Sequence, residues 1–427
     1  MPLMFEKYES HAKSYCKKFP TIFEKGKDSL IFDLDGRAYI DLLAGAGSLN
    51  YGHNNEQIKN SVIEYMSNNG LALSLDLHSA SKRSFLEAFV YKILEPRQLD
   101  FRIQFTSPTG TSVIESALKL ARKFTNRDNV LCFTNGFHGM TGNALSITGS
   151  DHHRQRGMSS QVTRLPFEGY LGNDFDYIGY YRKLLTDPSS GVDLPAAVVV
   201  EVIQGEGGLN VASNKWLQGL RQLTYEHNIL FIVDDIQAGC GRSGNFFSFE
   251  ESGIKPDMVC LSKSLGGMGL PLSLLLITPK ADIWKPAEDN GTFRGNNLAF
   301  VAATTMIEQF WSNSEFEQSV QQKAQKITSF LSEIANEYDE FVLKVKGRGL
   351  MQGVLVKDPV FSEYIVNFCF ANYLLLERCG PTDEVLKLMP ALTIDDETLS
   401  KALTIIRQAF VSLRENSLIA TDVIIAE

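Results

Sequence analysis

The middle of the chain alternates short, β-branched apolar runs with segments of helical period, and this alternation constrains the fold more than any other feature. The runs at 196–203, 229–235, 257–262 and 272–278 have the length and residue types of buried strands. The segment 214–228 lies between two of them and carries apolar residues at helical spacing. Strand, helix and strand in this order predict an α/β fold with a mostly parallel sheet covered by helices.

The two ends of the chain have a different pattern. Residues 315–341 predict one long amphipathic helix, 342–356 predict a pair of strands or a hairpin, and 30–43 predict a strand. These segments favour a second, smaller α+β domain built from both chain ends. The expected boundaries are 58–309 for the large domain and 1–57 together with 310–427 for the small domain.

Composition excludes several classes of protein. The net charge of −9 over 427 residues leaves no basic surface for nucleic acid. No apolar run approaches the ~20 residues that span a bilayer, and we expect no membrane partner and no signal peptide. The six cysteines are scattered, without C-x-x-C or a zinc-ligand spacing, so we expect free thiols, no metal site and a cytoplasmic protein.

Residues 231–247, FIVDDIQAGCGRSGNFF, contain two competing motifs. The glycines have the G-x-G-x-x-G spacing of a dinucleotide loop, but the strand does not lead directly into them and no helical pattern follows Gly244. The acids Asp234 and Asp235 could form a Walker B pair, but the chain lacks the G-x-x-x-x-G-K-[ST] loop that such a pair serves. The glycines therefore predict a turn. Asp234 stands where open α/β sheets bind ligands, although a helix cap or a surface ion pair is an equal alternative for this residue alone.

Lys263 follows the next predicted strand, in KPDMVCLSKSLGG. Most lysines are solvated surface groups, but an ammonium at the end of an apolar run is partly desolvated, which lowers its pKa. A lysine with a lowered pKa is what Schiff-base chemistry needs. Pyridoxal phosphate combines such a lysine with an aspartate at its ring nitrogen, and Asp234 would supply that aspartate.

These residues resemble the class III aminotransferases of the fold-type I pyridoxal phosphate enzymes. Within that family the chain is most similar to the diaminobutyrate–2-oxoglutarate transaminases of ectoine biosynthesis. The resemblance covers nearly the whole chain. The motifs that carry it are FIVDDIQAGCGRSG, KPDMVCLSKSLGG, DLLAGAGSLNYGH, TNGFHG, QGEGG and NGTFRGNNLAFV.

The resemblance implies a set of cofactor contacts, transferred residue by residue. Lys263 would bind pyridoxal phosphate as a Schiff base, and Asp234 would hold its pyridine nitrogen. Gln237 would face the phenolic oxygen of the cofactor. Phe137 would stack on the ring with His138 beside it; without the resemblance, Phe137 would more often be a core residue.

The cofactor phosphate needs hydrogen-bond donors. The helix predicted over 111–125, with Thr109 or Thr111 as its N-cap, places Gly110 and Thr111 at an N-terminus that favours an anion. Family members also reach this phosphate from the partner subunit, and Thr292 matches that position. The resemblance therefore implies a homodimer, or a higher homo-oligomer, with shared active sites.

Three further residues are implied to lie around the substrate. Glu201 corresponds to a glutamate near the cofactor ring and Glu206 to a gate glutamate. Lys387 stands where many relatives have the arginine that pairs with that gate. A lysine offers a point charge instead of a planar fork, so the geometry of carboxylate binding would differ.

The implied reaction exchanges a terminal amine between L-2,4-diaminobutyrate and 2-oxoglutarate, with L-aspartate 4-semialdehyde and L-glutamate as the other pair. Its partners would be a small amino donor and a 2-oxo acid acceptor. Three alternatives stay open: a class III aminotransferase for another diamine or ω-amino acid in a natural-product pathway, a pyridoxal phosphate aminomutase, and a cofactor-free binding protein. The presence of Lys263, Asp234 and Gln237 together argues against the last.

Overall fold

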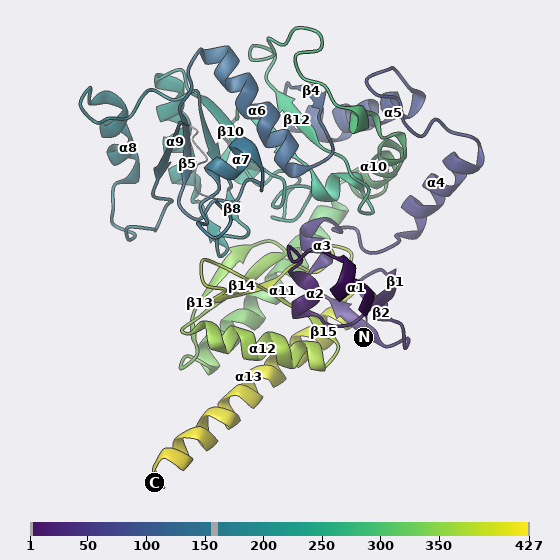
Figure 1. The fold of residues 1–427 in the computed structure, drawn as a ribbon, viewed down its shortest axis with the longest axis vertical. Coiled ribbons are helices and arrows are strands. Elements are labelled where there is room, and N and C mark those ends of the chain that lie inside the picture. Colours follow the sequence, from purple (N-terminus) through teal and green to yellow (C-terminus); the bar gives the residue numbers. More distant parts are fainter. Residues whose placement is uncertain (1–2, 155–160, 426–427) are drawn as a thin grey trace.

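The computed structural model describes residues 3–154 and 161–425 and has two parts (Figure 1). The upper part holds the central sheet with helices on both sides. The lower part holds smaller sheets, the N-terminal segment and the C-terminal helices. Within the described residues, no helix is both long enough and apolar enough to cross a bilayer.

Seven of the described strands form the central sheet. Neighbouring strands are parallel except where β12 pairs with β4 and β11, both antiparallel. The predicted α/β fold with a mostly parallel sheet is confirmed, and the run at 272–278 is its antiparallel member. In spatial order the strands are β4 (Arg102–Phe105), β12 (Leu274–Ile277), β11 (Met258–Leu261), β10 (Leu230–Asp234), β7 (Ala197–Val200), β5 (Val130–Phe133) and β6 (Val162–Leu165).

The central strands are apolar on both faces because each face meets a layer of helices. Val198 and Phe231 belong to one buried cluster, which includes apolar residues of α9, whereas Val199 and Ile232 belong to another, which includes those of α6. α6 begins where the Thr109 side chain accepts a hydrogen bond from a backbone amide of the first turn. The helices of this part are α4 (Glu56–Ser67), α5 (Ala80–Phe89), α6 (Gly110–Thr125), α7 (Gly142–Ile147), α8 (Tyr177–Thr186), α9 (Asn214–Glu226) and α10 (Asn297–Phe310).

The lower part contains two four-stranded sheets and three longer helices. The predicted long helix and the pair of strands after it are confirmed. One sheet has the order β13 (Val342–Arg348), β14 (Met351–Val356), β17 (Val385–Leu388), β16 (Glu377–Cys379); the other has the order β1 (Phe23–Lys27), β2 (Leu30–Asp33), β3 (Ala38–Asp41), β15 (Leu374–Leu375). The helices are α11 (Glu315–Glu337), α12 (Pro359–Ala371) and α13 (Asp396–Ile425).

The single strand predicted over 30–43 is wrong, because this segment folds into the antiparallel strands β2 and β3. The turn between them contains Gly36 at φ +80°, a left-handed conformation that glycine adopts without steric cost. The Asp33 carboxylate accepts hydrogen bonds from the backbone amides of Asp35 and Arg37 and so closes the turn.

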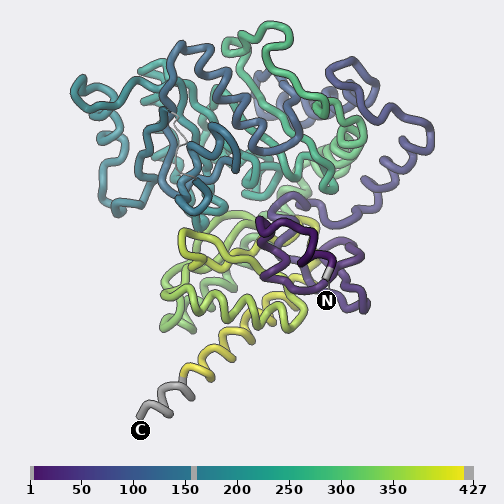
Figure 2. Tube along the Cα trace, viewed as in Figure 1, coloured from purple at the N-terminus to yellow at the C-terminus, as the bar shows by residue number. Residues whose placement is uncertain are grey.

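β3 and β15 are parallel neighbours, so the N-terminal and C-terminal segments share one sheet; Figure 2 shows the purple and yellow-green segments together in the lower part. One buried cluster contains Tyr39 and Leu42 together with residues from α11 to α13. This shared core supports the domain boundaries expected above, which we keep as a proposal. The shorter elements are α1 (Leu3–Tyr8), α2 (Tyr15–Lys18), α3 (Ala44–Gly47), β8 (Ile203–Gln204) and β9 (Asn210–Val211).

Candidate active site

A cavity of about 200 Å³ lies at the carboxyl ends of β7, β10 and β11, where α6 begins. This is the edge at which open α/β sheets bind their ligands. The cavity contains every predicted site residue except Thr292 and Lys387. Its lining consists of Gly110, Thr111, Phe137, His138, Gly139, Met140, Glu201, Glu206, Asp234, Ile236, Gln237 and Lys263.

Lys263 stands on a turn directly after β11, with a left-handed backbone at φ +50°. Such a conformation costs a non-glycine residue about 1–2 kcal/mol and is often found where function fixes a side chain. Neighbouring side chains hold the turn, since Ser262 bonds to Ser273 and Ser264 donates to the Gly47 carbonyl. Burial lowers the pKa of Lys263, and the nearby charge of Lys387 acts in the same direction. A lysine with this environment is suited to nucleophilic chemistry.

Asp234 is the last residue of β10 and is buried at the cavity floor. Its Oδ2 lies 2.7 Å from Nδ1 of His138, and its Oδ1 accepts a hydrogen bond from the Ile236 amide. Burial opposes a charge on His138, but the hydrogen bond and the charge of Asp234 raise the pKa of the ring. The carboxylate therefore stands in a buried, oriented pair.

Asp235 does not share this environment. Its Oδ2 accepts a hydrogen bond from the Ser248 amide, and burial raises its pKa to about 7. Successive strand residues point to opposite faces, which explains why only the first acid of the pair lines the cavity. The structure thus separates two acids that the sequence presents as neighbours.

The N-terminus of α6 forms another wall. Gly110 and Thr111 are its first residues, and their amide groups belong to the turn whose N–H groups lack helical partners. A Cβ at position 110 would come within 3.2 Å of the Ile236 side chain, so the glycine permits a close approach of two walls. Such a helix start favours an anion through its free amides and its dipole.

The remaining wall contains Phe137, Glu201 and Gln237. The Phe137 amide donates to Glu201 Oε2 at 2.9 Å, and burial raises the pKa of Glu201 to about 7. Gln237 donates through Nε2 to the Ala46 carbonyl and to Glu206 Oε1. Its Oε1 is buried and has no hydrogen-bond partner among the described residues, so it can accept a hydrogen bond from a bound group.

These groups fit pyridoxal phosphate. Lys263 could bind it covalently, Asp234 could hold its ring nitrogen, Phe137 could cover a ring face and the start of α6 could hold its phosphate. The unsatisfied Gln237 oxygen is a further polar atom that calls for a bound group. Met140 and Ile236 were not anticipated; they are apolar residues whose side chains carry no chemical signature in the sequence.

Lys387 does not line the cavity. It lies in β17, fully buried, and its Nζ is 3.0 Å from Glu206 Oε1 and 3.0 Å from Glu377 Oε2. Burial would raise the pKa of Glu206, but the charges of Lys387 and Lys263 lower it to about 2. The predicted pair of Glu206 and Lys387 is therefore present, with Glu206 between the lysine and the cavity. Glu377 was missed, although an acid after the apolar run Leu374–Leu376 was a visible signal.

Like Lys387, Thr292 is not among the residues that line the cavity. It begins the short helical turn Thr292–Gly295 and is exposed to solvent. Its predicted role, at the cofactor phosphate of a partner subunit, stays a prediction.

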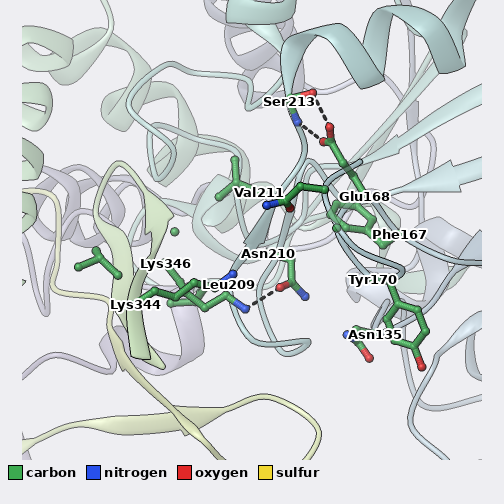
Figure 3. A pocket seen from close by; sticks show the side chains of 14 residues that line it. Asn135, Phe167, Glu168, Tyr170, Leu209, Asn210, Val211, Ser213, Lys344 and Lys346 are labelled. Carbon is green, nitrogen blue, oxygen red and sulfur yellow. Dashed lines mark hydrogen bonds between the residues drawn. The ribbon is translucent and has the colours of Figure 1, made fainter. Parts of the chain in front are cut away.

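A larger cavity of about 630 Å³ lies apart from these residues, between β13 and the loops around β9 (Figure 3). Lys346 Nζ donates to Asn210 Oδ1, and the Glu168 carboxylate accepts from the amide and hydroxyl of Ser213. Because Lys346 and Glu168 already bond to other lining residues, we place the candidate site in the smaller cavity.

Known aminotransferases are similar to this chain over almost its full length. The family description "Aminotransferase class-III" matches residues 11–410. A diaminobutyrate–2-oxoglutarate transaminase of Vibrio parahaemolyticus is 48% identical over 95% of this chain and 96% of that protein. The enzyme of the same name from Vibrio cholerae is 49% identical, covering 95% and 98%.

Solved structures share the fold at lower sequence identity. The ornithine aminotransferase of Toxoplasma gondii has a TM-score of 0.82 at 24% identity, covering 96% of this chain and 94% of that one. An S-selective transaminase from Arthrobacter sp. has a TM-score of 0.85 at 20% identity, covering 96% and 97%. With a strand-end lysine and aspartate facing one cavity, and a family match that spans the site, the chain belongs to the class III aminotransferases, which use pyridoxal phosphate as cofactor.

Proposed function

We propose that this aminotransferase moves the terminal amino group of L-2,4-diaminobutyrate to 2-oxoglutarate, giving L-aspartate 4-semialdehyde and L-glutamate. Relatives named diaminobutyrate–2-oxoglutarate transaminase are 46–49% identical over most of both chains. The observation that carries the proposal is the arrangement of Lys263 and Asp234 in one cavity, with the Glu206–Lys387 pair at its edge. A switchable acid–lysine pair suits an enzyme that must accept a diamine and a dicarboxylate in turn.

When bound, pyridoxal phosphate acts as an electron sink for the carbanion that forms at the reacting carbon of the substrate. Asp234 would keep a proton on the ring nitrogen, and its bond to His138 fixes the orientation of the carboxylate. Lys263 would move a proton at its Nζ, first as general base and then as general acid. Its lowered pKa favours the neutral amine that the first of these steps requires.

Glu206 and Lys387 would select the two substrates. With the pair closed, the cavity presents a carboxylate, which suits a substrate that carries a second ammonium group. With Glu206 turned away, the lysine would face a substrate carboxylate. Kinetics with two separate half-reactions should therefore be ping-pong.

We also propose a homodimer in which Thr292 reaches the cofactor phosphate of the neighbouring subunit. Exposed apolar side chains lie on the segment 71–77 and beside Thr292 at Phe293, which is 64% exposed. The two segments adjoin, since the Ser74 amide donates to the Gly295 carbonyl. A contiguous exposed apolar surface of this kind commonly marks a protein interface. All six cysteines are free thiols, which supports action in the reducing cytoplasm.

A steady-state assay with purified protein, added cofactor, diaminobutyrate and 2-oxoglutarate tests the substrate proposal. We expect glutamate to form only when both substrates are present. Turnover without the oxo acid would indicate an aminomutase instead. A better rate with another diamine or ω-amino acid, measured in the same panel, would reassign the amino donor.

Hybrid dimers test the shared site. Mixing Thr292→Ala subunits with Lys263→Ala subunits should give dimers with one doubly defective site and one intact site. The intact site should bind cofactor with near-normal affinity, measured by titrating the separated hybrid. Two defective sites in the hybrid would show that Thr292 acts within its own subunit.

A further inference from the structure

Lys387 has two carboxylate partners instead of the single one that a switch requires. Glu377 in β16 stands directly opposite Lys387 in the antiparallel register with β17. Glu206 approaches the same Nζ from the turn after β8, and each acid has an oxygen 3.0 Å from the nitrogen. One ammonium group therefore lies between two carboxylates.

The two acids differ in their freedom to move. Glu377 is 4% exposed, belongs to a paired strand, and its Oε1 accepts a 2.8 Å hydrogen bond from the Tyr15 hydroxyl. The Glu206 side chain is 33% exposed and lines the cofactor cavity. Both hydrogen bonds to Glu206 fall on Oε1, and Oε2 has no partner among the described residues. Glu206 is therefore the acid that can turn away.

A buried ammonium without a counter-ion is costly and tends to lose its proton. If Glu206 were the sole partner, its departure would leave Lys387 uncharged when a substrate carboxylate arrives. The other titratable groups facing the lysine cannot replace the acid. Burial raises the pKa of Cys379 to about 12 and keeps it neutral, burial likewise raises the pKa of Tyr15, and Lys263 carries no negative charge in either protonation state.

We propose that Glu377 is a positioning residue that stays paired with Lys387 when Glu206 turns away, holding the ammonium charged and aimed at the carboxylate of the oxo acid. This inference rests on the proposed function of the Glu206–Lys387 pair. The substrate carboxylate takes the place of Glu206, so Lys387 keeps two negative partners in both half-reactions. Tyr15 supports the arrangement by fixing the second oxygen of Glu377.

The test is Glu377→Gln, which preserves the size of the side chain and removes its charge. The primary measurement is the dissociation constant of glutarate, a dicarboxylate without the keto group, determined by calorimetry from pH 6.5 to 9. The second is KM for 2-oxoglutarate in the half-reaction of the aminated enzyme. Wild-type binding should be nearly independent of pH across this range, whereas the variant should lose about tenfold in affinity per pH unit above the lowered pKa of Lys387.

Matched variants separate positioning from general damage. Glu384→Gln removes a charge from the same β16–β17 hairpin without touching Lys387, and should bind glutarate as the wild type does. Tyr15→Phe removes only the hydrogen bond to Glu377 and should shift the profile in the same direction by less. Glu377→Asp should restore part of the affinity at high pH. Because Tyr15 is partly exposed, its variant tests the idea even if Glu377→Gln does not fold.

The outcomes are distinct. A pH profile for Glu377→Gln that matches the wild type would overturn the inference and leave the proposed function intact. Equal loss in both half-reactions, with a changed cofactor absorbance, would show a structural role only and would also overturn it. A wild-type enzyme that binds neither glutarate nor 2-oxoglutarate would instead overturn the proposed function itself.

Discussion

Two lysines stand near Glu206, the half-buried Lys263 and the fully buried Lys387, and their environments are opposite. Burial lowers the pKa of Lys263, and the nearby acids offset only part of this effect. The pKa of Lys387 is raised well above its usual range although burial opposes this, because Glu206 and Glu377 both stabilise its charge. The same side chain is thus prepared as a nucleophile in one place and as a permanent cation in the other.

The difference arises from the backbone that carries each lysine. Lys263 is on a strained turn at a strand end and makes no ion pair within 3–154 and 161–425. Lys387 is inside a paired strand, with an acid directly across from it. Strand ends leave a side chain unpartnered and facing a ligand, whereas cross-strand positions supply a fixed partner.

Replacing the first lysine should have the largest effect. Lys263→Ala should lose the covalent link to the cofactor and nearly all turnover, by several orders of magnitude, because no other lysine among the described residues lines the cavity. Absorbance of the bound cofactor and mass spectrometry after borohydride reduction measure the link. Lys387→Ala is the matched control and should keep it. If the Lys263→Ala variant kept a covalent link through another lysine, Lys263 would not be the nucleophile that distinguishes it from Lys387.

Asp234→Asn should have the next largest effect. It removes the charge that holds a proton on the ring nitrogen, so proton transfer should slow by about 10²- to 10⁴-fold while cofactor and amine still bind. Single-turnover absorbance with the amine donor alone measures this step. The control is Asp235→Asn, whose side chain faces the other way and should leave the rate close to normal. A reversed result would transfer the role to Asp235.

Removing the second lysine should mainly affect the oxo acid. Lys387→Ala should raise KM for 2-oxoglutarate through the loss of about 1–3 kcal/mol of binding free energy, roughly 5- to 150-fold. The rate of the amine half-reaction should change less. Because the variant leaves Glu206 and the buried Glu377 without their cation, Lys387→Met combined with Glu377→Gln provides a less strained comparison. Equal damage to both half-reactions, or none, would remove Lys387 from substrate recognition.

The smallest effect concerns pH. In cofactor-free protein, Lys263 should lose its proton at lower pH than Lys387, because its pKa is lowered and that of Lys387 is raised. Glu206→Gln should move the Lys263 titration to still lower pH, since Glu206 raises this pKa. The NMR shifts of isotope-labelled lysine side chains along a pH series measure both titrations without a reagent that must reach the buried Lys387. Two lysines that titrate together would contradict the opposite environments.

The sequence predicts the first lysine far better than the second. Lys263 and Asp234 each follow an apolar run, and the parallel pairing of β10 with β11 brings those run ends together. The Lys387 cluster instead depends on the register of β16 with β17 and on a bond between residues 362 positions apart, Tyr15 and Glu377. No local period encodes such contacts. Family resemblance supplied the pairing of Lys387 with Glu206, but Glu377 emerged only from the fold.

The prediction of a single strand over 30–43 was wrong for another reason. Its apolar residues continue on both sides of Asp35 and Gly36, which conceals the turn within an apparently single strand. The turn chemistry was present, since an acid followed by glycine is a common turn signal. We gave the hydrophobic pattern more weight than this short turn signal, although the turn signal correctly indicated two strands.

The parallel contact between β3 and β15 has a consequence for biosynthesis. Its two strands are separated by more than 300 residues, so β3 is synthesised early in translation and β15 late. The central sheet, with Lys263 and Asp234, can emerge and fold before β15 is available to pair with β3. Lys263 and Asp234 would therefore come together before Tyr15, Glu377 and Lys387 do. The proposed substrate-recognition cluster would be the last part of the active site to form.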